Sequence, residues 1–103
     1  MVVSENFMEY VLDQLSLLDG ISTRKMFGGV AIYRYKKIFA LVSDDTVYMK
    51  VDETTKAKYI DAGSTPLVPF PNRPIIKSYY ELPVDILENV DELVEWVEES
   101  LLL

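Results

Sequence analysis

The sequence predicts a single α+β domain in which helices pack against an antiparallel sheet, with elements in the order α-β-β-β-α-β-α. Two segments with apolar residues at helical spacing stand near the two ends of the 103-residue chain. Between them, three segments rich in β-branched and aromatic residues follow one another with short connections, which favours antiparallel neighbours. No linker, internal repeat or low-complexity tract interrupts the chain, so we expect one domain over residues 1–103.

The first helix is expected over residues 5–18. Ser4 can cap its N-terminus, and Gly20 can end it. Its apolar side chains recur at helical spacing, and we interpret this stripe as a core face. The stripe consists of Phe7, Val11, Leu15 and Leu18.

Three strands are expected next, over residues 24–35, 38–42 and 46–51. The second is wholly apolar and suits a central strand, whereas the third alternates between apolar and polar side chains. The turns that join them are expected near residues 35–37 and 44–45.

Gly28 and Gly29 lie inside the first predicted strand. Glycines in a strand mark a bulge or a close approach of another part of the protein. A phosphate-binding loop would need its glycines between a strand and a helix N-terminus. We therefore interpret the pair as structural.

A second helix is expected over residues 53–62, with Asp52 as its cap and Gly63 at its end. Residues 64–76 contain four prolines, which predict a loop because proline has no amide donor. This loop is long enough to be a candidate functional segment, but a simple crossing of the sheet explains it equally well.

A last strand over residues 75–82 is expected to end at Pro83, and a short helix can follow over residues 84–88. The final helix begins with Asn89 and Glu92 in the pattern of a capping box. Its apolar face predicts packing on the sheet, and its remaining surface is acidic, which serves either solubility or the docking of a basic partner. The terminal Leu101, Leu102 and Leu103 suit either the core or the seam of a homodimer.

The composition excludes several classes of chemistry. The chain contains no cysteine and no histidine, which removes disulfides, thiolate nucleophiles, the usual triads and the common zinc, haem and iron–sulfur ligands. We therefore expect no catalytic residues, no metal site, no cofactor and no enzymatic activity. The longest apolar run, residues 38–42, is far too short to cross a membrane, and the acidic N-terminus is unlike a signal peptide. A cytoplasmic location without membrane association is expected.

The charge is unevenly distributed. The net charge of −7 comes entirely from the second half, whereas residues 24–37 contain five bases and no acid. Such a segment is either a solvated surface or a docking surface for an acidic partner. The candidate partner-binding residues are Arg24, Lys25, Arg34, Lys36 and Lys37. Tyr33, Tyr35 and Tyr48 could add stacking if the partner were a nucleic acid, although the overall negative charge disfavours such a partner.

The order of several short blocks carries a family resemblance. Residues 24–33, which read RKMFGGVAIY, are followed by FALV at 39–42, YMKVD at 48–52 and SYYELP at 78–83. In this order the blocks resemble the TfoX (Sxy) N-terminal-domain family, and the match extends over nearly the whole chain. The motif residues, which we expect to specify the fold, are Arg24, Met26, Phe27, Gly28, Gly29, Tyr33, Tyr79, Tyr80 and Pro83.

The resemblance implies an α+β fold similar to secretion chaperones, and kinship with regulators of bacterial natural competence. Those regulators act as co-activators with the cyclic-AMP receptor protein and are not known as enzymes. The chain departs from the full-length regulators because it ends after the N-terminal domain and lacks their helical C-terminal domain. We therefore expect a stand-alone TfoX N-terminal-like domain.

Three functional hypotheses follow. The first is a non-enzymatic regulatory module, resembling this domain of the competence regulators, that binds a protein partner. The second is direct nucleic-acid binding through the basic segment from Arg24 to Lys37. The third is a small-molecule-binding or enzymatic role under the loop from Pro66 to Pro74.

Overall fold

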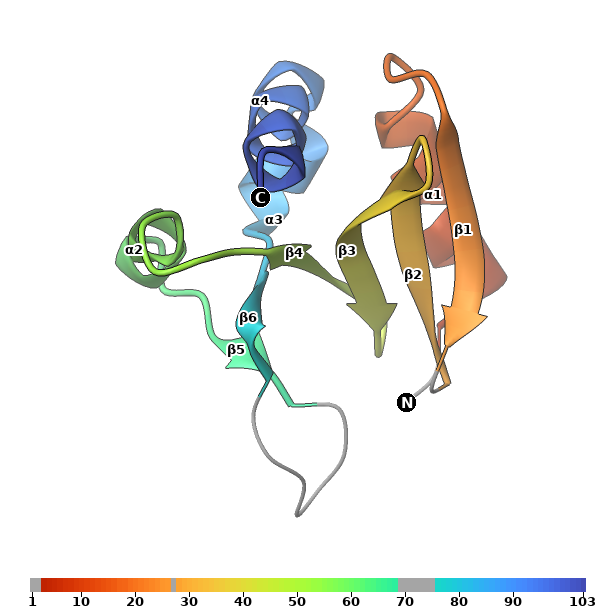
Figure 1. Cartoon of the computed structure of the whole chain (residues 1–103). Helices are drawn as coiled ribbons and strands as arrows, with labels where there is room; N and C mark the ends of the chain where they lie inside the picture. The colour runs from red at the N-terminus through yellow and green to blue at the C-terminus, as the bar shows by residue number, and fades with distance from the viewer. Residues whose placement is uncertain (1–2, 27, 69–75) are drawn as a thin grey trace.

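A computed structural model describes residues 3–26, 28–68 and 76–103, and it confirms the predicted α+β class. In this described part, six antiparallel strands form one sheet in the order β1-β2-β3-β4-β6-β5. The strands are β1 (Ile21–Met26), β2 (Gly29–Arg34), β3 (Lys37–Ser43), β4 (Thr46–Lys50), β5 (Pro66–Leu67) and β6 (Ile76–Glu81). The helices are α1 (Glu5–Gln14), α2 (Lys56–Asp61), α3 (Val84–Glu88) and α4 (Val90–Leu101). Figure 1 shows β4, β6 and β5 turned away from β1–β3, so the sheet is strongly twisted.

All four helices contribute to one hydrophobic core. Buried side chains such as Val11 of α1, Tyr59 of α2, Leu87 of α3 and Leu93 of α4 pack with one face of the sheet. The sheet contributes Ile32, Ala40, Val42, Val47, Met49 and Tyr80 to this cluster. Phe39 also joins the cluster beside Ala40, because the pairing of β2 with β3 is irregular at this point. Elsewhere adjacent strand residues point to opposite faces, and those on the other face are not part of this cluster.

The first helix is capped as predicted but ends earlier. The Ser4 hydroxyl accepts a 3.1 Å hydrogen bond from the Phe7 amide, and the Ser4 amide donates to Asp45 in the β3–β4 turn. The α-helix stops at Gln14 rather than at residue 18, since the chain continues in tight turns. Leu18 still packs against the core from these turns.

The predicted strand over residues 24–35 is in fact a hairpin of two strands. β1 and β2 pair antiparallel, and Met26 lies opposite Gly29, so Gly28 stands in the turn and Gly29 begins β2, rather than both lying in the middle of one strand. Gly28 has a φ of +78°, which favours glycine. Gly29 lies so close to β3 that a Cβ there would collide with the carbonyl oxygen of Val42. The expected close approach is confirmed, and a turn rather than a bulge accounts for the first glycine.

The next two turns lie where the sequence predicts them. Tyr35 and Lys36 join β2 to β3, and Asp44 and Asp45 join β3 to β4. All four residues have positive φ values between 48° and 66°, as two-residue hairpin turns of the primed type require.

The second helix begins three residues later than predicted. Asp52 caps the preceding turn, because its carboxylate accepts hydrogen bonds from the amides of Thr54 and Thr55 at 2.8 and 2.9 Å. Gly63 follows the helix with a φ of +85°, as expected.

The proline-rich segment contains one short strand that the sequence did not predict. Pro66 and Leu67 pair with β6 as β5. Residues 69–75 of the predicted loop lie outside the described residues.

The C-terminal helix confirms its predicted cap. The side-chain oxygen of Asn89 accepts a hydrogen bond from the Glu92 amide at 3.2 Å. Trp96 of α4 packs edge-to-face on Tyr59 of α2, with ring centroids 4.7 Å apart. This contact fixes α2 against α4 beside the end of the sheet.

Candidate partner-binding surface

The face of the sheet opposite the core carries no described helix. The strand register sets Arg24, Ala31, Leu41, Tyr48 and Glu81 side by side in one row across β1, β2, β3, β4 and β6. None of these residues belongs to the helix-packed core. Tyr33 and Tyr79 lie on the same face, because each is adjacent in its strand to a core residue, Ile32 or Tyr80. We call the surface formed by Tyr33, Leu41, Tyr48 and Tyr79 the open face.

The three tyrosines of the open face are partly buried, and the pKa values of two of them are raised. Burial raises the pKa of Tyr48, and the carboxylates of Glu81 and Asp44 raise it further. Burial also raises the pKa of Tyr79, and the phenol of Tyr33 adds to the effect. Tyr33 and Tyr79 stand on strands that β3 and β4 separate, and both side chains face the same side of the sheet. The open face is therefore a partly buried aromatic surface.

The chemistry of the open face suits recognition. The raised pKa values of Tyr48 and Tyr79 keep these two phenols protonated at neutral pH. They can therefore donate hydrogen bonds but are poor nucleophiles and poor bases. Tyrosine combines a large apolar ring with a polar end, a combination that is enriched at protein interfaces. In the described part of the chain, no group of three acidic, histidine or cysteine side chains could hold a metal ion.

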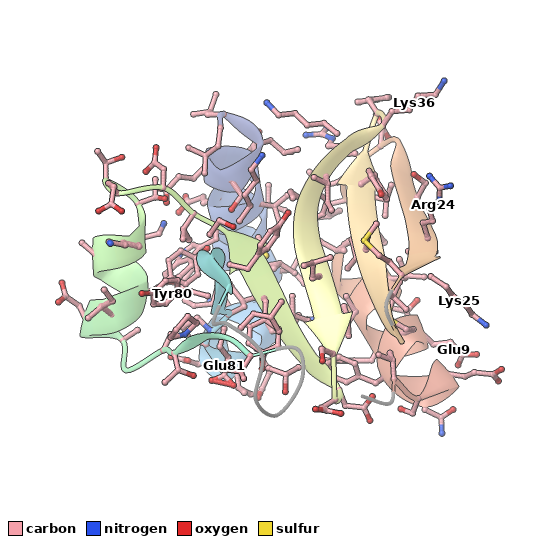
Figure 2. The ribbon with its side chains drawn as sticks, turned by 60° about the horizontal axis from the view of Figure 1, so that its bottom comes forward. Glu9, Arg24, Lys25, Lys36, Tyr80 and Glu81 are labelled. Atoms are coloured by element: carbon pink, nitrogen blue, oxygen red, sulfur yellow. The ribbon has the colours of Figure 1, made fainter. Side chains whose placement is uncertain are left out.

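The five predicted basic residues do not form one patch. Arg24 stands on the side of β1 that continues the open face, whereas its neighbour Lys25 points to the opposite side. Figure 2 shows Arg24 and Lys25 diverging from β1, with Lys36 at the distant turn. Arg34 and Lys37 lie opposite each other next to that turn. The structure therefore brings together Arg34, Lys36 and Lys37, but neither Arg24 nor Lys25 joins them.

Two of the three bases at the β2–β3 turn border an open hollow beside the end of α4. Arg34, Tyr35, Lys37 and Leu101 line it. The Arg34 Nε donates a 3.0 Å hydrogen bond to the Asp19 carbonyl, and its guanidinium lies 5.6 Å from the centre of the Tyr35 ring. These contacts hold Arg34 in place, which is a structural use of one predicted partner-binding residue.

The terminal leucines differ in burial. Leu101 packs against the core, whereas Leu102 is 86 % exposed. Leu102 therefore adds an apolar group to the surface near the basic turn.

The family-motif residues have two kinds of position. Gly28, Gly29 and Tyr80 serve the turn, the strand contact and the core, and Pro83 precedes α3, as a fold-specifying role requires. Tyr33 and Tyr79 instead lie on the open face. Phe27 lies outside the described residues.

Sequence reasoning included Tyr79 among the family-motif residues but placed neither Tyr79 nor Leu41 on a common surface. Leu41 belongs to a wholly apolar run in which alternation gives no signal. The sequence does contain a signal for Tyr79. When two tyrosines are adjacent in a strand, only one of them can face the core.

The site predicted under the proline-rich loop lies largely outside the described residues. The described flank contributes a half-exposed Val68, at 51 %, and the buried Leu67 of β5. Neither residue carries reactive chemistry.

Comparison with known proteins gives one match. The family model of the TfoX N-terminal domain matches residues 13–102. A search of curated proteins finds no match. Within the described residues, no helix is both long and apolar enough to cross a membrane.

Proposed function

The chain belongs to the TfoX N-terminal domain family, and we propose that it is a non-enzymatic regulatory module that binds a protein partner through the open face. The observation that supports this most is the gathering of Tyr33, Leu41, Tyr48 and Tyr79 on a sheet face that no described helix covers. A protein partner would bury the aromatic rings and accept hydrogen bonds from the phenols.

The charge of the surroundings favours a protein over a nucleic acid. Glu81 and Asp44 are close enough to raise the pKa of Tyr48, so negative charge borders the aromatic surface. A phosphate backbone would be repelled there and by the net charge of −7. In the alternative, a nucleic acid would bind the basic segment from Arg24 to Lys37, of which only Arg34, Lys36 and Lys37 gather at one turn.

Two observations support a role without catalysis. Tyr48 and Tyr79 of the open face have raised rather than lowered pKa values, which is opposite to the activation of a nucleophile or base. The chain also contains neither histidine nor cysteine. Kinship with competence regulators makes a cytoplasmic transcription factor the first partner to examine.

Site-directed photo-crosslinking tests the proposal. A photoreactive phenylalanine analogue replaces Tyr48 or Tyr79 in the open face, or Tyr10 of α1 as the control, which is 38 % exposed. In cells that make the protein, we expect one discrete protein adduct from the two open-face positions and none from Tyr10. Equal adducts from all three positions, or no adduct from Tyr48 and Tyr79, would count against the open face as the binding site.

A second arm separates the nucleic-acid alternative. The double variant Lys36→Glu with Lys37→Glu reverses charge at the β2–β3 turn without touching the open face. We expect the protein adducts to persist in this variant, and no salt-sensitive binding of a single-stranded oligonucleotide by either form. Oligonucleotide binding that weakens steeply with salt and disappears in the variant would favour the alternative.

A further inference from the structure

β1 is an edge strand whose outer side is open. Among the described residues it pairs only with β2, and it stands at the end of the strand order. The Tyr35 amide donates to the Gly20 carbonyl at 2.9 Å, which makes Gly20 and Tyr35 a hydrogen-bonded pair. Hydrogen-bonded and non-bonded pairs alternate along an antiparallel ladder. The backbone groups of Ser22 and Arg24 therefore point toward β2.

The same alternation turns the remaining backbone groups of β1 outward. Ile21, Thr23 and Lys25 direct their N–H and C=O groups away from the sheet. In the part of the chain that the structure describes, no backbone or side-chain group is hydrogen-bonded to them across this edge. Six hydrogen-bonding groups are thus aligned for another strand.

The charge along this edge has one sign. The exposed Arg24 and Lys25 stand on opposite faces of β1, and neither forms an ion pair with a described residue. No acid occurs between residues 20 and 43. Glu9 of α1 lies on the same side as Lys25 in Figure 2, but no ion pair joins the two in the described structure. A strand added beside β1 would therefore lie next to Arg24 on one face of the sheet and next to Lys25 on the other.

We propose that β1 binds an extended acidic segment of a protein partner as an additional strand of the sheet. The inference rests on the proposed function and specifies the chemistry of the partner. The outward backbone groups supply hydrogen bonds regardless of sequence, and Arg24 and Lys25 select carboxylates at adjacent positions of the incoming strand. A second copy of β1 is disfavoured, because antiparallel pairing of two copies would bring like charges together.

The position of Arg24 links this edge to the open face. Arg24 lies opposite Ala31, in the row that continues to Leu41 and Tyr48. Ser22, on the same side of β1, lies opposite Tyr33. A partner whose extended segment pairs with β1 can therefore continue across the tyrosines of the open face.

A peptide titration followed by NMR tests the pairing directly. The probe is the blocked hexapeptide Thr-Val-Glu-Glu-Val-Thr, and the matched control is Thr-Val-Lys-Lys-Val-Thr. With the acidic peptide we expect the amide signals of Thr23 and Lys25 to shift and their hydrogen exchange to slow, while those of Ser22 and Arg24 change little. The lysine peptide is expected to bind at least tenfold more weakly. Equal binding of both peptides, or shifts confined to other strands, would overturn the inference.

A backbone variant provides a second readout. Thr23→Pro removes an outward amide but no ladder bond, so the fold is expected to survive, and Thr23→Ala is the control. We expect Thr23→Pro to weaken binding of the acidic peptide at least tenfold and Thr23→Ala to leave it within twofold. If Thr23→Pro does not fold, the amide pattern of the unmodified chain decides. Full binding by a folded Thr23→Pro variant would refute strand addition.

The outcome for this edge is separable from that for the open face. If photo-crosslinks form at Tyr48 and Tyr79 but are unaffected by Thr23→Pro, the chain binds a protein without strand addition. If acidic peptides pair with β1 but no crosslink forms at the open face, the proposed function fails while the edge retains its specificity. A dimer that dissociates in Thr23→Pro would assign the edge to a second copy of the chain and would contradict the acidic partner.

Discussion

The side-chain hydroxyl of Ser100 donates a 2.8 Å hydrogen bond to the carbonyl oxygen of Lys50. The bond joins the last turns of α4 to the end of β4, fifty positions earlier in the chain. Ser100 is 2 % exposed and is one of only two buried polar residues in the described structure, the other being Ser43. A serine in the apolar face of a helix is costly unless its hydroxyl is bonded. The bond therefore explains why this position tolerates a serine.

Replacing Ser100 with alanine is expected to destabilise the protein by about 1–2 kcal/mol, because the Lys50 carbonyl would lose its donor in a partly buried position. For a domain of this size, each 1 kcal/mol corresponds to a fall in Tm of about 4–8 °C. Thermal and urea unfolding measure the change. The control is Ser16→Ala, at an exposed position before β1 where no described hydrogen bond involves the hydroxyl. An equal effect of both substitutions would show that the bond to Lys50 is not stabilising.

Tyr59 is expected to respond in the opposite way. Its side chain is 1 % exposed, and its hydroxyl has no hydrogen bond to any described residue, although Ser100 is nearby. A buried hydroxyl without a partner is unfavourable. We therefore expect Tyr59→Phe to leave the free energy of unfolding unchanged or to raise it by up to about 1 kcal/mol. If urea unfolding showed a decrease in the free energy of unfolding of more than about 1 kcal/mol, the hydroxyl would have a hydrogen-bond partner, such as a buried water.

The same tyrosine predicts how stability depends on alkaline pH. Burial raises the pKa of Tyr59 well above the value of about 10 expected in the unfolded chain. The free energy of unfolding is unaffected by this group below pH 10. It falls progressively as the pH rises above 10, because the unfolded state then releases the Tyr59 proton while the folded state retains it. The free energy of unfolding should fall less between pH 9 and pH 11.5 in Tyr59→Phe than in the parent protein. Parallel curves for the two proteins would contradict the raised pKa.

The fold was predictable wherever patterning or capping residues were strong. Ser4 and Asn89 mark the starts of α1 and α4, and they cap these helices as predicted. The first hairpin was not recognised, because β1 is a polar edge strand with four exposed residues in succession and gives no alternation signal. Without β1, the turn at Gly28 looked like the middle of one strand. Only the pairing of Met26 with Gly29 shows the reversal of the chain.

The candidate surface was predictable only in part. Alternation along the strand predicts that Tyr48 faces away from the core, and in the structure Tyr48 is not part of the core. The sequence does not reveal that Tyr33 and Tyr79 share one face of the same sheet, since their strands are separated by two others. Proximity in sequence also suggested a single basic segment, but a hairpin turn between Lys25 and Arg34 and the alternation of side chains separate the charges.

Lys58 is expected to stabilise the contact between α2 and α4. Its Nζ lies 4.0 Å from the centre of the Trp96 ring and 3.0 Å from a carboxylate oxygen of Glu99. Lys58→Met keeps most of the apolar stem but removes the charge, so we expect a loss of about 0.5–1.5 kcal/mol. Urea unfolding followed by the fluorescence of Trp96, the single tryptophan, measures it.

The matched control for Lys58 is Lys56→Met. Lys56 forms a 2.9 Å ion pair with Glu53, but this glutamate side chain is 89 % exposed. Such a pair contributes little, so the change should be clearly smaller than the loss at Lys58. The loss at Lys58 should also persist in part at high salt, because the contact with the indole ring is screened less than the ion pair. If Lys58→Met and Lys56→Met had the same free energy of unfolding in 1 M salt, the whole stabilisation by Lys58 would come from its ion pair with Glu99.

Gly29 and Gly63 should tolerate side chains by different rules. At Gly29 the φ value is ordinary, but an added Cβ collides with the backbone oxygen of Val42, so the cost should grow with side-chain size. At Gly63 there is open space within 4 Å, but φ is +85°, so the cost depends on backbone preference. We expect Gly29→Ala to cost at least about 2 kcal/mol and Gly29→Asn to cost more. Gly63→Ala should cost about 1–2 kcal/mol, and Gly63→Asn should cost less than Gly63→Ala because asparagine accepts a left-handed backbone. Urea unfolding of the four variants measures which of alanine and asparagine is tolerated better at each position. If asparagine were tolerated better than alanine at Gly29, backbone conformation rather than contact with β3 would require that glycine.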